Sequence, residues 1–321
     1  MERPHDFVER LEKDMSLKIL LYLEDPYDLA AVSGVSKSWR RFVIENGLLK
    51  QLCLKLWPDL SKIIDVDELI DKPKRDDIST LDIPSFLTRD HRVFSLLSYG
   101  LTSFPSNDQI KDAVCASSTD RYPDERIENT LMEDQLETTY WSSGGEADQT
   151  VPETLVYKLA ADLCLISEIH VQPYQAFTEP LDPTYSAEAV RFCMCHRRSP
   201  LKLSDSSAAQ SYDDDMFMWT YTSPEYPMAQ TSENQRFRLP RPILCMGGIL
   251  KIELLGRAQN SYIDGLYYIC VSHVQAFGRS LGPLFEISVI DDTGCCIVNR
   301  IYGVPSVRNE IDDRRCCYCC Y

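Results

Sequence analysis

Cysteine is the residue type of this sequence most able to carry chemistry. Thirteen cysteines are present, and six of them fall in the last 27 residues. The terminal run Cys316-Cys317-Tyr318-Cys319-Cys320 could bind a thiophilic metal, could be acylated, or could be an unstructured end. A four-thiolate zinc site normally uses two separated pairs of cysteines, so thiols crowded into five residues disfavour it. We therefore expect no metal and no cofactor, and we expect most thiols to be small, reduced, buried hydrophobes.

Motifs for catalysis are absent or weak. Gly247-Gly248 lacks the following Lys-Ser/Thr of a phosphate-binding loop, and no Gly-x-Ser-x-Gly elbow is present. The run Asp213-Asp214-Asp215 could bind a hard cation, although a triple-acid run is more often simply solvated. The five histidines are scattered along the chain. These patterns predict a protein without an active site of its own.

Composition and charge place the chain among globular proteins. It has 321 residues, 44% hydrophobic and 26% charged, and its length favours two domains. No run of about eighteen apolar residues and no secretory signal is visible, so we expect a soluble protein of the cytoplasm or the nucleus. The formal net charge is −16, and residues 109–292 carry 27 acids against 14 bases. This excess of acids argues against a nucleic-acid partner.

Residues 1–57 show the apolar spacing of a small helical module. In the first helix the apolar positions cover more of the circumference than one small core requires, which hints at an interface. Asp25 suits the N-cap of the second helix, because Pro26 then takes its first position. The expected helices are Met15–Leu23, Tyr27–Ser33, one that follows an N-cap at Ser36 and ends at Asn46-Gly47, and Leu48–Trp57.

The order and spacing of residues in this module resemble the F-box. The most diagnostic part is Val32-Ser33-x-Val35-Ser36-x-Ser38-Trp39-Arg40, and it follows Ile19-Leu20 and Asp25-Pro26-x-Asp28-Leu29. The Leu-Pro that commonly begins the motif is replaced here by Leu11-Glu12. The resemblance implies docking to a Skp-type adaptor and, through it, to the cullin and RING subunits of an SCF-type ubiquitin ligase. The residues that it assigns to the adaptor are Leu11, Leu17, Ile19, Leu20, Leu23, Pro26, Leu29, Val32, Val35 and Trp39.

Residues 58–108 are expected to form a helical connector. Phe94, Leu97 and Leu101 lie at helical spacing and predict a helix over His91–Leu101. The segment Asp71–Asp77 is charged and contains a proline, and it predicts a flexible loop within the connector.

From residue 109 to residue 292 the pattern changes to short segments of alternating polarity separated by turns. In one of them, Ile166-x-Glu168-x-His170 alternates with Ser167-x-Ile169-x-Val171. Several short strands with this spacing favour an antiparallel β-sandwich. The expected strands are Leu155–Leu159, Ile166–Val171, Ala189–Met194, Met216–Tyr221, Gln235–Leu239, Leu250–Leu255, Tyr267–Phe277 and Phe285–Ile290.

Several motifs in this region carry a second resemblance. They include Ala116-Ser117-Ser118-Thr119, Tyr122-Pro123, Tyr140-Trp141-Ser142-Ser143-Gly144 and the closing Tyr267-Tyr268-x-x-Val271. The region is similar to discoidin-like (galactose-binding-like) jelly rolls such as the Doc-type domain, and to the C-terminal half of plant-type F-box proteins. The resemblance implies an α+β multidomain chain, in which an N-terminal helical F-box is followed by an antiparallel β-sandwich (jelly roll) over 109–292. Residues 293–321 would then form a Cys-rich C-terminal tail.

Two functions from different classes follow. In the first, the chain is the substrate-recognition subunit of an SCF-type cullin–RING ubiquitin ligase, and the sandwich binds a target protein with or without glycans. Catalysis would then belong to the RING subunit, so this chain would not be an enzyme. The alternative is a lectin-like protein that binds a carbohydrate or small ligand, with a structural helical N-terminus. A lectin has no need of the Val-Ser-x-x-Trp-Arg pattern, which favours the first function.

Target contacts are expected in two long connections between strands, Pro173–Tyr185 and Thr222–Asn234. Their prolines restrict the loops before binding, and their tyrosines offer large contact area with a polar tip. The alternative is that these tyrosines pack over the ends of the sheets. Trp141 is assigned to packing. The predicted target-contact residues are Tyr174, Phe177, Tyr185 and Tyr226.

Overall fold

The computed structural model of the chain divides into two compact units. The first, called the helical unit, comprises residues 1–104 with 283–285 and 297–321, and the second, the sandwich unit, comprises residues 105–282 with 286–296. The structure describes residues 7–67, 83–103, 105–132, 139–177, 179–197, 217–282, 285–289 and 295–300. The predicted loop Asp71–Asp77, the acidic run Asp213–Asp215 and the terminal cysteine run lie outside the described residues.

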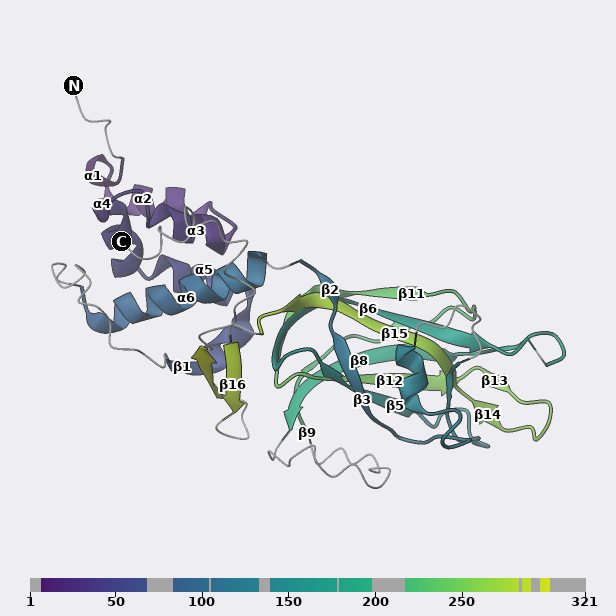
Figure 1. Ribbon diagram of the computed structural model, residues 1–321. Helices are drawn as coiled ribbons and strands as arrows, with labels where there is room; N and C mark the ends of the chain where they lie inside the picture. The colour runs from purple at the N-terminus through teal and green to yellow at the C-terminus, as the bar shows by residue number, and fades with distance from the viewer. Residues whose placement is uncertain are drawn as a thin grey trace. The chain divides into compact units, whose positions relative to one another are not determined.

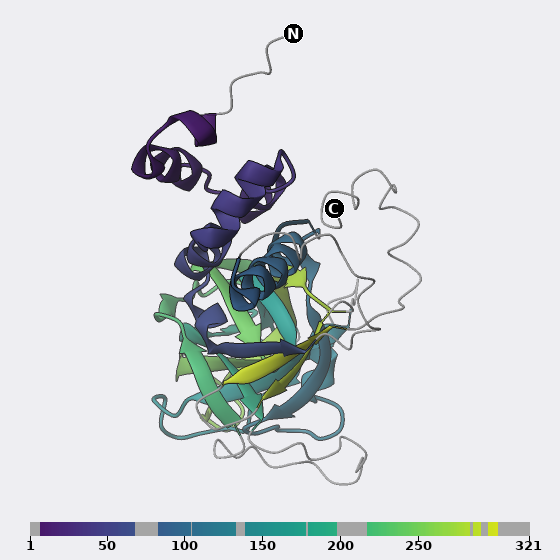
Figure 2. The same ribbon diagram turned by 90° about the vertical axis from the view of Figure 1, so that its left-hand side faces the viewer.

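The helical unit begins with short helices whose caps follow the sequence prediction. The Asp25 side chain accepts a hydrogen bond from Tyr27 N at 2.8 Å, and Ser36 Oγ accepts one from Trp39 N at 3.2 Å. Gly47 takes a left-handed φ of 58° between two helices, a conformation that favours glycine. The helices are α1 (Phe7–Arg10), α2 (Lys13–Leu21), α3 (Pro26–Val32), α4 (Lys37–Glu45), α5 (Leu48–Leu56), η1 (Pro58–Lys62) and α6 (Ser85–Ser103) (Figures 1 and 2).

Most helix ends of this unit lie within two residues of the prediction, and the main differences are as follows. Helix α2 ends at Leu21 with Tyr22 as its C-cap, so Leu23 lies beyond it. Helix α6 begins at Ser85, six residues before the predicted start, because polar residues there hid its first turns from the apolar pattern. Within the predicted helical connector, residues 63–67 form the strand β1 (Ile63–Asp67) instead of a helix. This strand belongs to a sheet of the order β1-β17-β16, with β17 (Cys296–Arg300) and β16 (Phe285–Val289).

The sandwich unit consists of two large antiparallel sheets and a separate two-stranded antiparallel sheet, β13-β14. One large sheet has the order β10-β8-β12-β5-β3, with β9 also paired to β8; the other has the order β11-β6-β15-β2, with β4 paired to β15 and β7 to β6. Neighbouring strands are mostly far apart in sequence, and the predicted antiparallel β-sandwich is confirmed (Figure 1). The strands are β2 (Asn107–Asp108), β3 (Ile110–Ala116), β4 (Trp141–Ser142), β5 (Glu153–Leu159), β6 (Leu163–Gln175), β7 (Thr184–Tyr185), β8 (Ala187–Arg197), β9 (Phe217–Thr222), β10 (Tyr226–Pro227), β11 (Gln235–Met246), β12 (Ile249–Arg257), β13 (Gln259–Asn260), β14 (Tyr267–Tyr268) and β15 (Cys270–Ser280).

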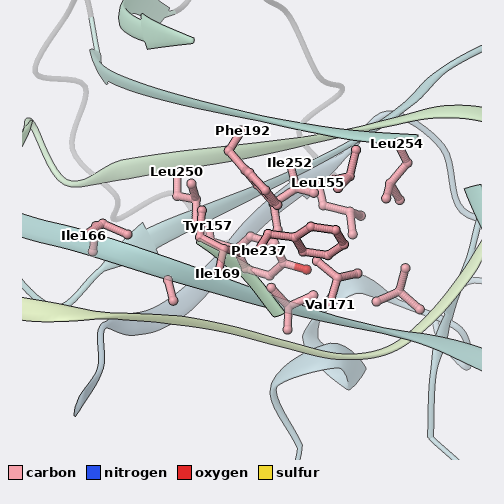
Figure 3. Packing of buried hydrophobic residues seen from close by; sticks show 14 of the residues in the cluster. Leu155, Tyr157, Ile166, Ile169, Val171, Phe192, Phe237, Leu250, Ile252 and Leu254 are labelled. Carbon is pink, nitrogen blue, oxygen red and sulfur yellow. The ribbon is translucent and has the colours of Figure 1, made fainter. Parts of the chain in front are cut away.

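The core of this unit lies between the two sheets. Leu155, Phe192 and Ile252 come from one sheet and Ile169 and Val171 from the other, and all five are fully buried (Figure 3). Burial of a side chain of this size stabilises the fold by about 1.5–3 kcal/mol. The packing of alternate residues from both sheets closes the sandwich.

Strand β6 departs from simple alternation. Ile166 lies in the core together with Ile169 and Val171, although strict alternation would place Ile166 on the opposite face. The pairing register of β6 with β15 shifts between Phe277↔Glu168 and Gly278↔Ile166. The extra residue at this bulge is Ser167, whose Oγ donates to Phe277 O at 3.2 Å. A bulge adds one residue to a strand and so reverses the face of everything beyond it.

Candidate functional site

Helix α2 presents an exposed apolar face. Met15 and Ile19 are one turn apart, and they remain 48% and 41% exposed, while Tyr22 at the helix C-cap is 85% exposed. Leu20 of the same helix is only 2% exposed and belongs to the core of the helical unit. Large apolar side chains that are exposed side by side mark an interaction surface. Leu11, which precedes the helix, and Leu21 at its last position are also exposed. We call Met15, Ile19 and Tyr22 the α2 face.

The segment after α3 is held by a buried contact with helix α6. Ser33 Oγ donates to Ala30 O at 2.6 Å and lies 3.2 Å from His91 Nε2. Burial, together with the positive charge of Arg40, lowers the pKa of His91 from 6.5 to about 4. The imidazole is therefore neutral at physiological pH, and it fixes the segment that carries the Val-Ser-x-x-Trp-Arg pattern.

A second surface is formed where four loops of the sandwich converge. We call these loops, residues 117–126, 139–149, 176–186 and 258–268, the loop end (right-hand side of the sandwich in Figure 1). Gly144 N donates to Ser118 Oγ at 2.9 Å, Glu146 bridges Tyr267, and the rings of Tyr185 and Tyr268 lie 6.3 Å apart. Each loop is thus in contact with its neighbours.

Arg257 holds two of these loops, residues 139–149 and 258–268, from the interior of the unit. It is fully buried and forms an ion pair with the nearly buried Glu153. Its Nη1 donates to Ser143 Oγ at 3.0 Å and to the carbonyls of Gly144 and Tyr267 at 2.8 and 2.9 Å. Its Nε donates to Val151 O at 3.0 Å. The pair and its hydrogen bonds are fully internal to the unit, so their function is to fix the shape of the loop end.

Three tyrosine–carboxylate pairs lie in the loop end, where Glu125 and Tyr185 are buried and Asp264 is exposed. The hydroxyl of Tyr140 donates to Glu125 at 2.9 Å, that of Tyr185 to Glu179 at 2.7 Å, and that of Tyr268 to Asp264 at 2.6 Å. Tyr174 stacks on Tyr140 with ring centroids 3.8 Å apart. We call these seven side chains the tyrosine–carboxylate cluster: Glu125, Tyr140, Tyr174, Glu179, Tyr185, Asp264 and Tyr268.

Burial and hydrogen bonding set the protonation of the cluster. Burial, reinforced by the neighbouring carboxylates, raises the pKa of Tyr140, Tyr185 and Tyr268. The hydrogen bond from Tyr268 lowers the pKa of Asp264, whereas burial raises that of Glu125. The phenols therefore remain protonated donors, and at least the exposed Asp264 remains ionised, across the physiological range.

Apolar side chains project around the cluster. Five large apolar residues of the loop end are exposed, Leu181 almost completely at 99%. They come from three of the four loops. They are Tyr122, Phe177, Leu181, Tyr262 and Ile263.

Comparison with known proteins identifies the family of this chain. The F-box-like family matches residues 13–55, which span α2 to α5. The F-box protein At4g00755 of Arabidopsis thaliana is 44% identical over 96% of this chain and 85% of its own length. The chain belongs to the F-box protein family. This membership supports, in general terms, the role of an SCF substrate adaptor.

The sandwich of this F-box protein is similar to carbohydrate-binding modules in solved structures. A family 32 module of C. perfringens NanJ, solved with galactose, is 10% identical with a TM-score of 0.34, over 52% of this chain and 98% of that one. A fragment of a putative chitobiase from Bacteroides thetaiotaomicron is 11% identical with a TM-score of 0.38, over 56% of this chain and 96% of that one. The similarity concerns the course of the chain and carries no information on ligands.

The ten predicted adaptor-contact residues fall into three groups. Leu20, Pro26 and Leu29 are buried in the F-box protein's own core. Their apolar spacing marks them equally well for core or interface, which is why the sequence could not separate the two. Leu17, Leu23, Val32 and Trp39 are half-buried, and Leu11, Ile19 and Val35 are exposed.

The four predicted target-contact residues also divide. Phe177 is exposed at the loop end and Tyr174 is a half-buried member of the cluster. Tyr185 is only 4% exposed, so it supports the cluster from within. Tyr226 packs against Phe192 and Phe237, and its hydroxyl donates to Arg238 O at 3.1 Å, so it covers the core as the packing alternative predicts. Trp141 is fully buried, as assigned.

Several residues of the cluster were not among the site residues predicted from the sequence. Glu125, Tyr140 and Tyr268 lie in different loops, and only the folded chain brings them together. Asp264 and Tyr268 are four residues apart around the Asp264-Gly265 turn, and that local pairing is the one signal that the sequence offered. The fully buried Arg257 carried no signal beyond its position at the end of a strand.

The described part of the chain offers little for metal or thiol chemistry. Within it, no group of three or more His, Cys, Asp or Glu side chains could hold a metal ion. Burial raises the pKa of Cys53, Cys245 and Cys270 to about 12 and that of Cys164 to about 11, which removes their nucleophilic thiolate form. None of the described helices is long and apolar enough to cross a membrane.

Proposed function

We propose that this F-box protein is the substrate-recognition subunit of an SCF-type cullin–RING ubiquitin ligase. The observation that carries the proposal is the combination, in one chain, of an F-box with an exposed apolar α2 face and a separate sandwich unit with its own exposed loop end. A receptor needs one surface for the ligase and another for the target. Ubiquitin transfer would be performed by the other subunits, so the chain itself would not be an enzyme.

The α2 face is the proposed contact with the Skp-type adaptor, which in turn would bind the cullin and RING subunits. Met15, Ile19 and Tyr22 would lose most of their exposed apolar area in such a complex, at about 25 cal/mol for each square ångström buried. The buried Leu20 and Leu29 would support this face by packing beneath it. Exposed Val35 is a further contact candidate.

The loop end is the proposed contact with the target protein. Loops vary without disturbing a sandwich core, and Arg257 would keep these loops in one shape before binding. The acidity of the sandwich argues against a nucleic-acid target. The proposed location is the cytoplasm or the nucleus, where reducing conditions would keep thirteen cysteines as thiols; imaging of a fluorescent fusion would test this.

Adaptor binding is the decisive test. The full chain is titrated with a purified Skp-type adaptor in a calorimeter, as wild type, Ile19→Glu and Leu181→Glu. Ile19→Glu adds a charge to the α2 face and should weaken binding at least tenfold, because an unpaired charge would be buried in the interface. Leu181→Glu adds the same charge to a 99% exposed residue of the loop end and should leave adaptor binding unchanged.

Circular dichroism melts accompany the titration. Both substituted side chains are exposed, so neither variant should lower the melting temperature. A folded wild-type chain that binds no Skp-type adaptor, or an Ile19→Glu variant that binds as tightly as the wild type, would overturn the proposed docking.

A further inference from the structure

Three of the four tyrosines in the tyrosine–carboxylate cluster use their hydroxyl donors internally. Each of Tyr140, Tyr185 and Tyr268 has one O–H group, and each donates it to a carboxylate of the cluster. Apart from the Tyr174 hydroxyl, these side chains offer a ligand carboxylate oxygens, phenol oxygens and aromatic ring faces, which are acceptors or negative in potential. Such a set suits a cation with several N–H groups, which needs acceptors alone, better than a neutral sugar, whose hydroxyls both donate and accept.

The charge of the loop end also favours a cationic ligand. Its four loops carry eight carboxyl side chains and two arginines. Arg121 is already paired with Asp120 and Glu125 at 3.7 and 3.9 Å, and Arg126 lies 4.0 Å from Glu128. Among the described residues, no lysine, arginine or histidine lies within ion-pair distance of Glu179 or Asp264. The eight carboxyl residues are Asp120, Asp124, Glu125, Glu146, Asp148, Glu179, Asp182 and Asp264.

The exposed apolar residues favour a cationic group that belongs to a ligand with apolar parts. Phe177 and Leu181 lie in the loop that carries Glu179, and Tyr262 and Ile263 lie next to Asp264. Exposed apolar side chains beside a carboxylate favour a ligand that has apolar groups next to its charge. A free metal ion or an inorganic cation has none, whereas a protein segment has them in its neighbouring side chains.

We propose that the loop end recognises a segment of a target protein in which an arginine or lysine is flanked by apolar residues. The cation pairs with the carboxylates of Glu179 and Asp264 and lies against the tyrosine rings. The apolar neighbours contact Phe177, Leu181, Tyr262 and Ile263. This inference rests on the proposed function and names the chemistry of the target.

The test is selection from a displayed random peptide library on the purified full chain. The wild type should enrich peptides with arginine or lysine next to large apolar residues. The double variant Glu179→Gln/Asp264→Asn keeps acceptors for both tyrosine hydroxyls but removes two charges. An enriched peptide should bind it at least tenfold more weakly, because hydrogen bonds to a charged acceptor are stronger than those to a neutral one. Affinity for the wild type should also fall with added salt.

Asp112→Asn is the matched control. Asp112 is an exposed carboxylate of β3, the strand that leads into residues 117–126, and its removal changes the net charge without touching the cluster. It should leave peptide affinity unchanged. Enrichment of peptides without a basic residue, no enrichment at all, equal affinity for the double variant, or displacement of the peptide by galactose would each overturn the inference. Adaptor binding is measured on the same proteins, so loss of the proposed function is seen separately.

Discussion

Replacing Arg257 by methionine tests whether the buried ion pair stabilises the loop end. The guanidinium is fully buried, pairs with Glu153 and donates to one hydroxyl and three backbone carbonyls. Removing one partner of a buried ion pair costs about 3–5 kcal/mol, because the other charge stays buried without compensation. Each carbonyl left without a donor adds about 1 kcal/mol or more. The total of about 5 kcal/mol or more is comparable with the whole stability of an ordinary domain.

The double variant Arg257→Met/Glu153→Gln separates charge from packing. It removes both charges, and the amide oxygen introduced by Glu153→Gln would still accept the hydrogen bond that Ser118 gives to the native carboxylate at 2.7 Å. We expect the double variant to be more stable than Arg257→Met alone, with a coupling of about 1–3 kcal/mol between the two sites.

Scanning calorimetry of the full chain provides the measurement. Arg257→Met should lower the melting temperature of the sandwich unit by about 10–20 °C and leave the transition of the helical unit in place. A shift below about 2 °C, or a double variant whose loss equals the sum of the two single losses, would refute the assignment of Arg257 as the internal clamp of the loops.

The remaining predictions concern both units. The pKa of His91 lies near 4 in the folded state against 6.5 unfolded, so the stability of the helical unit should be complete above about pH 6.5 and fall by up to about 3 kcal/mol towards pH 4; His91→Gln should flatten this dependence in urea titrations at each pH. Ile252→Ala in the core should cost about 2–5 kcal/mol in the same assay, whereas Leu181→Ala should stay within about 0.5 kcal/mol. Tyr174→Ala should weaken binding of a selected basic peptide about threefold or more through the lost ring face, without changing adaptor affinity.

The helices of the helical unit were predicted best, because the residues that begin and end them lie close to them in the sequence. Asp25 and Ser36 cap helices within three residues of themselves, and Gly47 ends one by its own backbone conformation. The residues of the F-box pattern also lie within a short stretch of the sequence. Its apolar positions nevertheless serve two surfaces, and only the fold shows that Leu20 is core and Ile19 is exposed.

The sequence predicted the class of the second unit, an antiparallel sandwich, but not the details of its strands and loops. The strands rich in β-branched and aromatic residues were found, but the bulge at Ser167 changes the phase of β6, and short strands such as β4 and β7 carry too few residues for any periodicity. The tyrosine–carboxylate cluster depends on contacts between separate loops. Loop residues have no periodic pattern, so nothing in the chain marks Tyr140 and Tyr174 as stacked neighbours before the sheets are assembled.

Reconstituted ubiquitin transfer tests most directly whether this chain connects a ligase to a basic target. The assay combines the Skp-type adaptor, cullin, RING subunit, this chain and a reporter protein that carries a selected basic peptide and accessible lysines. Ubiquitin should be attached to the reporter with the wild-type chain, but not with Ile19→Glu, and only weakly with Glu179→Gln/Asp264→Asn. Equal transfer with Ile19→Glu or without the chain, or no transfer by a wild-type assembly that holds both adaptor and reporter, would contradict the assignment of this F-box protein as a substrate receptor.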